Sequence, residues 1–235
     1  MHHVVLESWS RQNSALHARD PRVKIVLLAA YLAALGTAAR MPALTTLCYA
    51  APLAAAAGMA RLPARALLLR TAVVLPFSAT FAAFSMMAGD AGRAEALLAK
   101  SYLSAAAVLV VTATTPLPKL LWGFEALGFP RFLILVVQFL YRYLFVISGQ
   151  AQHMRLAARC RGSASGRLGF RRAAGAIAVL FARSYARAEG IHDAMLARGA
   201  AGQIRLLAGA RAGGRDFAFL AFGIAVIAAV RIWSL

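Results

Sequence analysis

The amino-acid sequence predicts an all-α polytopic membrane protein, and three observations support that prediction. Of the 235 residues, 61% are hydrophobic, and the mean hydropathy is +0.68. The apolar residues are gathered in long runs, which a soluble core of this size does not accommodate. The 18 net positive charges flank these runs, as Lys and Arg do in cytoplasmic loops. A pI near 11.6 would favour nucleic acid as the partner of a soluble protein, but this placement of charge favours membrane lipid and no nucleic acid.

Residues 1–22 form a polar segment that we expect on the cytoplasmic side, with no cleavable signal peptide. Asp20 followed by Pro21 is a helix-start signal, because a carboxylate can cap the first turn and proline suits the first helical position. The basic residues around this signal place the N-terminus inside.

Five apolar runs are candidate transmembrane helices: 23–39, 41–60, 71–88, 101–115 and 217–230. A turn at Arg40 separates the first two, and Pro76 is expected to kink the third. The loop at 61–70 is basic and is placed inside, whereas residues 89–100 are charge-balanced and form the predicted outer loop. The only charged side chain within the five runs is Lys24, which lies at an edge.

The number of spans follows from the positions of the arginines. Residues 150–215 hold twelve arginines against Glu189 and Asp193, so this region belongs inside. Four spans already return the chain to the inside at Pro116. The apolar stretch 132–149 is therefore expected to lie along the membrane rather than to cross it.

A short interfacial helix is expected at 117–129, whose apolar residues share one face: Leu120, Leu121, Phe124 and Leu127. We predict one compact membrane unit with four segments: a cytoplasmic N-terminal segment 1–22, a four-span region 23–115, an internal helical domain 116–215 and a C-terminal transmembrane helix 216–235.

Two long proline-free segments of the internal domain end on nearly the same tripeptide, Cys160-Arg161-Gly162 and Ala197-Arg198-Gly199. One interpretation is a C-cap, in which glycine closes the helix and arginine complements the helix dipole. A cap does not require arginine, so the second interpretation is a docking contact between each guanidinium and a carboxylate of a partner protein. The two interpretations are compatible, because the glycine turns the chain away and leaves the arginine exposed.

Several motifs resemble the transmembrane T-component of energy-coupling factor (ECF) transporters. They are LHARDPRVK at 16–24, TTP at 114–116 and the paired Arg-Gly endings. The stretch FLYRYLFV at 139–146 is most similar to the cobalt-uptake branch of that family, the CbiQ type. The resemblance covers nearly the whole chain, and it departs at Cys160, where the family pattern has alanine.

The resemblance implies five spans plus three coupling helices, in a non-catalytic subunit of the bacterial cytoplasmic (inner) membrane. The implied partners are two cytoplasmic ATPase subunits that bind ATP and Mg, a substrate-binding membrane subunit that holds the metal, and a small accessory membrane subunit. The implied substrate is the cobalt ion, with nickel or a vitamin as alternatives. The residues implied to bind the ATPases are the two tripeptides: Cys160, Arg161, Gly162, Ala197, Arg198 and Gly199.

The residues themselves favour neither an enzyme nor an ion-coupled carrier, because the predicted spans contain no Asp, Glu or His. No P-loop motif appears. The five histidines lack metal-site spacing, and Cys48 and Cys160 fit no zinc or disulfide pattern. We therefore expect no catalytic residue, metal site or cofactor in this chain. A membrane scaffold without a transport cycle is the alternative function, and co-purification with an ATPase distinguishes the two.

Overall fold

The computed structural model describes residues 14, 16–38, 42–162, 167–199 and 213–233. Helices make up most of these residues, and no strand occurs among them. The prediction of an all-α polytopic membrane protein is confirmed. The predicted turn at Arg40, most of the N-terminal segment, and residues 163–166 and 200–212 of the predicted internal domain lie outside the described residues.

The chain divides into two compact units, where one had been predicted. Unit 1 comprises Met1–Gly128 and Gly209–Leu235, and unit 2 comprises Phe129–Ala208. The division falls after Gly128 rather than after residue 115, because the helix that follows Pro116 packs against the first helix of unit 1. The predicted position of 116–215 on the inner side of the membrane remains a prediction.

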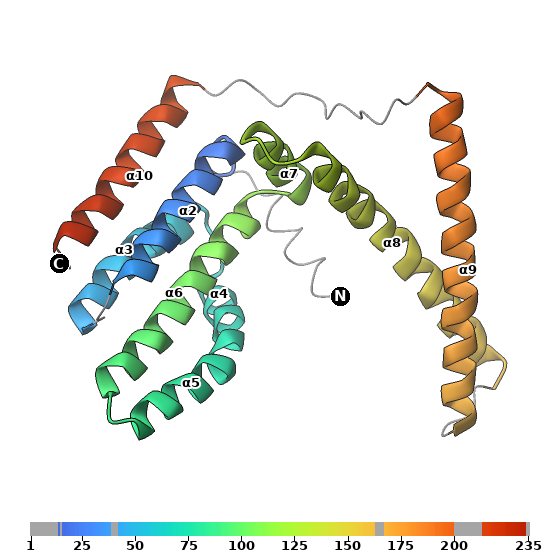
Figure 1. Cartoon of the computed structure of the whole chain (residues 1–235), viewed down its shortest axis with the longest axis horizontal. Coiled ribbons are helices and arrows are strands. Elements are labelled where there is room, and N and C mark those ends of the chain that lie inside the picture. The colour runs from blue at the N-terminus through green and yellow to red at the C-terminus, as the bar shows by residue number, and fades with distance from the viewer. Residues whose placement is uncertain (1–13, 15, 39–41, 163–166, 200–212, 234–235) are drawn as a thin grey trace. The chain divides into compact units, whose positions relative to one another are not determined.

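Unit 1 is a helical bundle with α2 and α6 at its centre (Figure 1). Its elements are α2 (Pro21–Thr37), α3 (Ala43–Met59), α4 (Ala64–Thr71), the 3-10 turn η1 (Ala72–Val74), α5 (Leu75–Met87), α6 (Ala91–Thr114), α7 (Leu117–Ala126) and α10 (Gly214–Trp233). Helix α2 contacts α6, α7 and α10, and α6 also packs against α3, α4 and α5. In the core, the hydroxyl of Tyr31 donates a hydrogen bond to the carbonyl oxygen of Tyr49, 3.0 Å away. Leu35 and Leu103 are buried in the same cluster.

Two local sequence signals, the Asp20-Pro21 helix start and Pro76, coincide with features of the structure. Asp20 caps α2, and its carboxylate accepts a hydrogen bond from the backbone N–H of Arg22 at 2.8 Å. Pro76 is the second residue of α5, just after η1, which interrupts the helix that runs from α4 into α5. The helix is therefore irregular next to Pro76, where a kink was predicted.

Two predicted loops are largely helical instead. Helix α4 begins at Ala64, within the predicted basic loop, and α6 begins at Ala91, within the predicted outer loop. At the start of α6 the Asp90 carboxylate caps the helix by accepting the backbone N–H of Arg93 at 2.9 Å. Charged residues are tolerated in these stretches because they lie near helix ends, where side chains reach polar surroundings.

The short helix expected at 117–129 corresponds to α7, but its buried face differs from the predicted one. Leu120 and Leu121 are buried as predicted, and Gly123 is buried with them. Leu127 is 45% exposed, so its assignment to this face was wrong. The reason is that α7 ends at Ala126, and the chain has left the helical path at Leu127.

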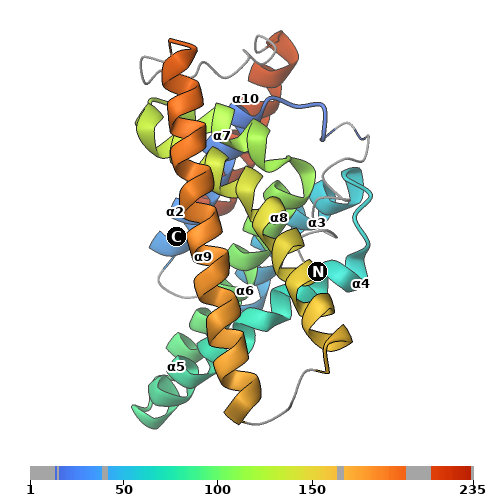
Figure 2. The ribbon, with the colours of Figure 1, turned by 90° about the vertical axis from the view of Figure 1, so that its right-hand side faces the viewer.

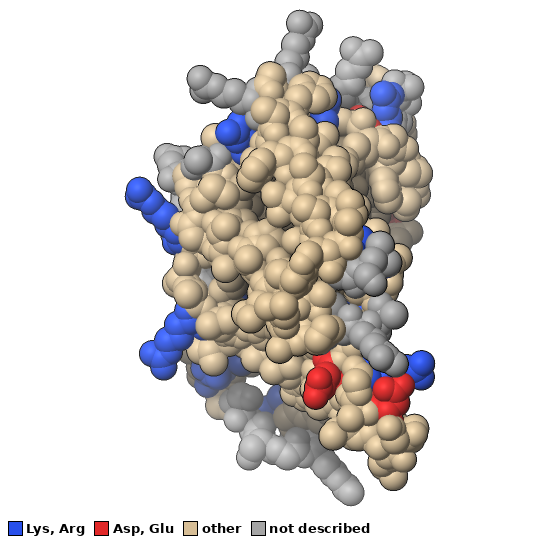
Figure 3. All heavy atoms as spheres, turned by 90° about the vertical axis from the view of Figure 1, so that its left-hand side faces the viewer, with Lys and Arg blue, Asp and Glu red and all other residues tan. Residues whose placement is uncertain are grey.

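By length and composition, four described helical stretches could cross a membrane: Ala64–Met87, Ala91–Thr114, Arg131–Cys160 and Asp216–Trp233. Helix α3 is a shorter apolar helix. The set differs from the five predicted spans because it includes Arg131–Cys160 and leaves out α2, which has 17 residues. Unit 1 is consistent with a bundle in a bilayer: the face in Figure 3 has no Lys, Arg, Asp or Glu across its middle and carries charged residues near its margins.

Unit 2 consists of α8 (Arg131–Cys160) and α9 (Arg167–Ala197). The two helices contact each other and run in roughly opposite directions (Figure 2). Ile134 is the one residue of this unit that is buried, within the part of it that the structure describes. Unit 2 is therefore a pair of long helices rather than a packed domain.

Candidate functional site

The first Arg-Gly ending is a helix C-cap. Helix α8 ends at Cys160, and Arg161 donates its backbone N–H to the carbonyl oxygen of Ala157 at 3.2 Å. Gly162 has φ +68° and donates to Arg159 O at 3.1 Å. Glycine is favoured at this position because the left-handed conformation is unhindered only without a Cβ.

The second Arg-Gly ending repeats this geometry at the end of α9. Arg198 donates its backbone N–H to Met195 O at 3.1 Å, and Gly199, with φ +72°, donates to Leu196 O at 2.9 Å. The cap interpretation therefore holds for both endings. The docking interpretation is compatible with it, because the residues of both tripeptides are exposed: Cys160, Arg161, Gly162, Ala197, Arg198 and Gly199.

The two endings lie at opposite ends of the α8/α9 pair (Figures 1 and 2). The start of α9 stays near the α8 cap, since the guanidinium of Arg172 donates to Gly162 O at 3.4 Å. Helix α9 has 31 residues, which corresponds to a length of about 46 Å. Arg161 and Arg198 are thus too far apart to bind one small epitope. No hydrogen bond or ion pair joins either guanidinium to another residue within the described ranges.

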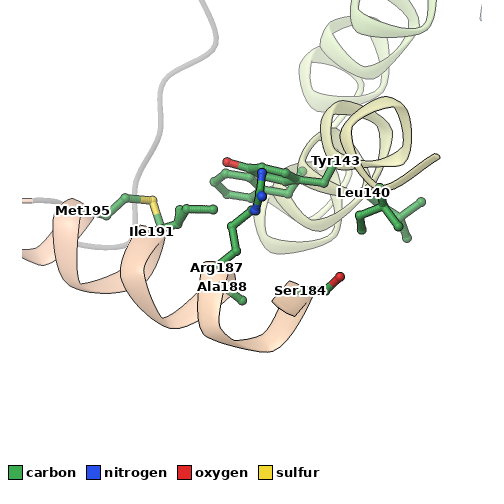
Figure 4. Close-up of a pocket in the computed structure, with 9 residues that line it drawn as sticks. Leu140, Tyr143, Ser184, Arg187, Ala188, Ile191 and Met195 are labelled. Atoms are coloured by element: carbon green, nitrogen blue, oxygen red, sulfur yellow. The ribbon is translucent and has the colours of Figure 1, made fainter. Parts of the chain in front are cut away.

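Between α8 and α9 lies an apolar groove of about 330 Å³. Arg187, Ile191 and Met195 reach from α9 toward Tyr143 on α8 (Figure 4). Phe139 and Ile147 continue the α8 wall, and Ser184 and Ala188 continue the α9 wall. The groove is open on one side, so it presents apolar side chains and one guanidinium to a binding partner.

A polar site lies at one end of unit 1, where the 16–24 motif meets the 114–116 motif. The ammonium group of Lys24 donates to the carbonyl oxygen of Thr114 at 3.1 Å and to the hydroxyl oxygen of Thr115 at 2.8 Å. Lys24 lies near the start of α2, at the edge of the first predicted span, and its side chain is only 4% exposed. The lysine holds the C-terminal end of α6 against α2.

Further contacts from the same segment hold α7 and α10. The guanidinium of Arg22 lies 4.2 Å from the centre of the Trp122 ring on α7. Arg19 forms an ion pair with Asp216 at the start of α10, with 3.5 Å between nitrogen and oxygen. These contacts bring the ends of four helices of unit 1 together at the residues of the 16–24 and 114–116 motifs.

The sequence analysis missed the groove residues and the partners of Lys24 and Arg19. The α8 wall of the groove could have been predicted, because Phe139, Tyr143 and Ile147 recur every four residues and therefore share one face of a helix. For Lys24 no local signal existed, because its partners are 90 and 91 residues away in the chain.

The described residues contain no group of three or more His, Cys, Asp or Glu that could hold a metal ion. Cys48 and Cys160 are free thiols. The geometry offers contacts for proteins and lipids, and the expectation of no metal or cofactor site in this chain remains a prediction.

A family model described as "Cobalt transport protein" (CbiQ) matches residues 12–206. This chain belongs to the CbiQ cobalt transport family. The match extends from the entry segment of unit 1 to beyond the second Arg-Gly ending, so it includes every described residue of the candidate site except Asp216 on α10. The resemblance to the CbiQ-type T-component is confirmed.

A curated relative of this CbiQ-family chain is an uncharacterized protein of Methanocaldococcus jannaschii. It is 31% identical over 101 residues, which cover 43% of this chain and 38% of the relative. The chain thus spans well under half the length of that relative. Family membership and the apolar helices together indicate a multi-pass membrane protein of a transport family.

Proposed function

We propose that this CbiQ-family protein is the transmembrane coupling subunit of an ATP-driven ECF-type transporter for cobalt uptake. In this role it links a substrate-binding membrane subunit to two cytoplasmic ATPase subunits, which bind ATP and Mg. The chain itself carries no catalytic residue and no cofactor.

The observation that carries the proposal is the pair of capped, exposed arginines at opposite ends of α8 and α9. Both guanidiniums are free of ion pairs within the described residues, so each is available to a carboxylate of a partner. Their separation along α9, about 46 Å, suits two separate partner subunits. Two ATPases, one at each ending, fit this geometry.

The transmission of movement follows from the same two helices. Movement of the ATPases would displace the helix ends, and helices this long carry the displacement to their apolar parts. The groove around Tyr143 and Ile191 offers the substrate-binding subunit an apolar contact there. A rocking movement of that subunit would supply alternating access without an ion site in this chain.

The test is cobalt uptake in cells that express the protein together with its partner subunits. Arg161→Ala and Arg198→Ala should each abolish accumulation of radiolabelled Co²⁺ while membrane insertion is unchanged. Arg183→Ala is the matched control, because Arg183 is exposed in the middle of α9, away from both endings. Arg171 is a less suitable control, because it lies close to the start of α9 and so near the first Arg-Gly ending.

If all three variants accumulate Co²⁺ equally well, the Arg-Gly endings are helix caps only, and the proposed coupling role is wrong. The same cells test the substrate: accumulation of Ni²⁺ or of a vitamin in place of Co²⁺ would reject cobalt and keep the coupling role. Purification of the wild-type protein without any ATPase would favour the scaffold alternative.

The inner position of the α8 end can be tested with a native thiol. Cys160 is exposed, and in a Cys48→Ser variant it is the one cysteine of the chain. A membrane-impermeant maleimide should label Cys160 only after cells are opened. Labelling in intact cells would place this ending outside and contradict the arginine-based topology.

A further inference from the structure

An open apolar groove runs along unit 1 and is separate from the Arg-Gly endings and from the groove of unit 2. Its volume is about 610 Å³, and its walls come from α2, α3, α6 and α10. Small residues line much of the α3 side, among them Ala51, Ala55 and Ala56. Phe222 and Val226 of α10 form the opposite wall. The space of the groove is left by the small residues of α3, which face bulkier residues of α10.

The length of the groove matches one leaflet of a bilayer. On α10 its lining extends from Phe219 to Val230, which at about 1.5 Å per residue corresponds to about 17 Å. The hydrocarbon core of a bilayer is about 30 Å thick, so the groove spans about half of it. An acyl chain of one leaflet has this reach.

The groove is about 17 Å long and about 610 Å³ in volume, a shape that one acyl chain fits more closely than a helix about 10 Å across. A single acyl chain is thinner and flexible, and it can follow the channel between Ala55 and Val226.

One end of the groove carries an excess of positive charge. Lys24, Leu16 and Phe219 line this end, and the guanidinium of Arg19 lies 5.6 Å from the centre of the Phe219 ring. Among the described residues, the charged groups at this end are the cations Arg19, Arg22, Lys24 and Lys119 and the anions Asp20 and Asp216. Four positive charges against two negative ones favour an anionic headgroup at the mouth.

We propose that this groove binds one acyl chain of an anionic phospholipid, with the lipid phosphate near Arg19 and Lys119 at its mouth. The lipid then fills the space between α3 and α10 and is a bound component of unit 1 rather than part of the exchanging bilayer. The proposal concerns unit 1 alone, so it stands or falls independently of the coupling role of the Arg-Gly endings.

The experiment uses the full chain in nanodiscs of phosphatidylcholine that contain a small fraction of phosphatidylglycerol with a photoactivatable acyl chain. After irradiation, peptide mass spectrometry locates the adducts. They should concentrate on the groove residues of α3 and α10, such as Ala55 and Val226. Excess unlabelled phosphatidylglycerol should lower this labelling several-fold, whereas unlabelled phosphatidylcholine should not.

Two variants, the first with a matched control, sharpen the result. Ala55→Phe fills the groove and should lower labelling several-fold, whereas Ala54→Phe adds the same side chain at an exposed position of α3 outside the groove. Lys119→Gln removes one charge at the mouth from an exposed side chain and should reduce the preference for phosphatidylglycerol.

Equal labelling by photoactivatable phosphatidylcholine, or undiminished labelling in Ala55→Phe, would overturn the proposal, since either shows ordinary contact with bulk lipid. A third measurement places a photo-crosslinking amino acid at position 51 in the groove, in place of Ala51, to identify what occupies it. A cross-link from this position to a second copy of the chain or to a partner subunit, with no lipid adduct, would also overturn it.

Discussion

Unit 1 and unit 2 are both built from long helices with apolar surfaces, but only unit 1 buries a core. In unit 1 the side chains of Tyr31, Leu35 and Tyr49 pack in its interior, and hydrogen bonds join residues up to 194 positions apart. In unit 2 only Ile134 is buried among the described residues. Phe132, Phe170 and Phe181 are each more than 70% exposed there.

This difference indicates what each unit needs in order to function. Unit 1 resembles a membrane domain that holds itself together by internal contacts. Both units expose aromatic side chains, among them Phe77 and Phe84 of unit 1 at 71% each, but unit 2 lacks a comparable core among its described residues. The surface of unit 2 is therefore suited to a bilayer and to partner subunits. Changes in unit 1 should therefore lower stability, whereas changes in unit 2 should lower assembly.

The largest effect is expected when both Arg-Gly endings are changed together. The double variant Arg161→Ala, Arg198→Ala should lose the ATPases on co-purification, because each lost charge-assisted contact costs about 2–5 kcal/mol. Its thermal unfolding midpoint in detergent should equal that of the wild type, since neither side chain has a partner within the described residues. A lowered unfolding midpoint with the ATPases still bound would contradict this prediction, because it would show that the two arginines of unit 2 stabilise the fold rather than the assembly.

The next largest effect is expected at the buried lysine of unit 1. Lys24→Met leaves the carbonyl of Thr114 without its ammonium donor in a buried site, which should destabilise the unit by about 1–3 kcal/mol. The thermal unfolding midpoint of the purified chain measures the loss. Lys119→Met is the control, because that side chain is exposed and should leave the midpoint nearly unchanged. Equal midpoints for both variants would show that the Lys24 contact does not stabilise α6.

An effect no larger than that at Lys24 is expected when the same substitution is compared in the two units. A Cβ at Gly123 of α7 would lie 2.8 Å from the Cδ1 atom of Ile25 and 3.4 Å from backbone of Pro21, whereas a Cβ at Gly190 of α9 would meet nothing within 4 Å. Gly123→Leu should therefore destabilise by about 1–3 kcal/mol through overpacking. Gly190→Leu should be neutral or stabilise by less than about 1 kcal/mol, because leucine favours the helix. A loss of similar size in both variants would mean that α9 is packed as tightly as α7.

Much of the site was accessible to sequence analysis because its signals are local. A cap joins residues within one helical turn, so Asp20 before Pro21 and the glycines after Arg161 and Arg198 were enough to locate helix ends. The fold class followed from apolar runs and from charge placement for the same reason.

The starts of α4 and α6 were misjudged because charged residues near a helix end look like a loop. Aspartate is a favoured N-cap residue, and the Asp90 carboxylate accepts the backbone N–H of Arg93. Asp90 would therefore have located the start of α6 correctly. The division after Gly128 had no such signal, because it depends on α7 packing against α2.

The sequence by itself therefore determined the all-α membrane class, the family motifs and the capped arginines, since each depends on neighbours in the chain or on composition. Only the tertiary structure decided that Lys24 is buried against Thr114, that α7 belongs to unit 1, and that a groove remains between α3 and α10. The physical reason is distance along the chain. Burial, ion pairs and cavities arise from side chains that meet only when helices pack, and no local pattern records which helices will be neighbours.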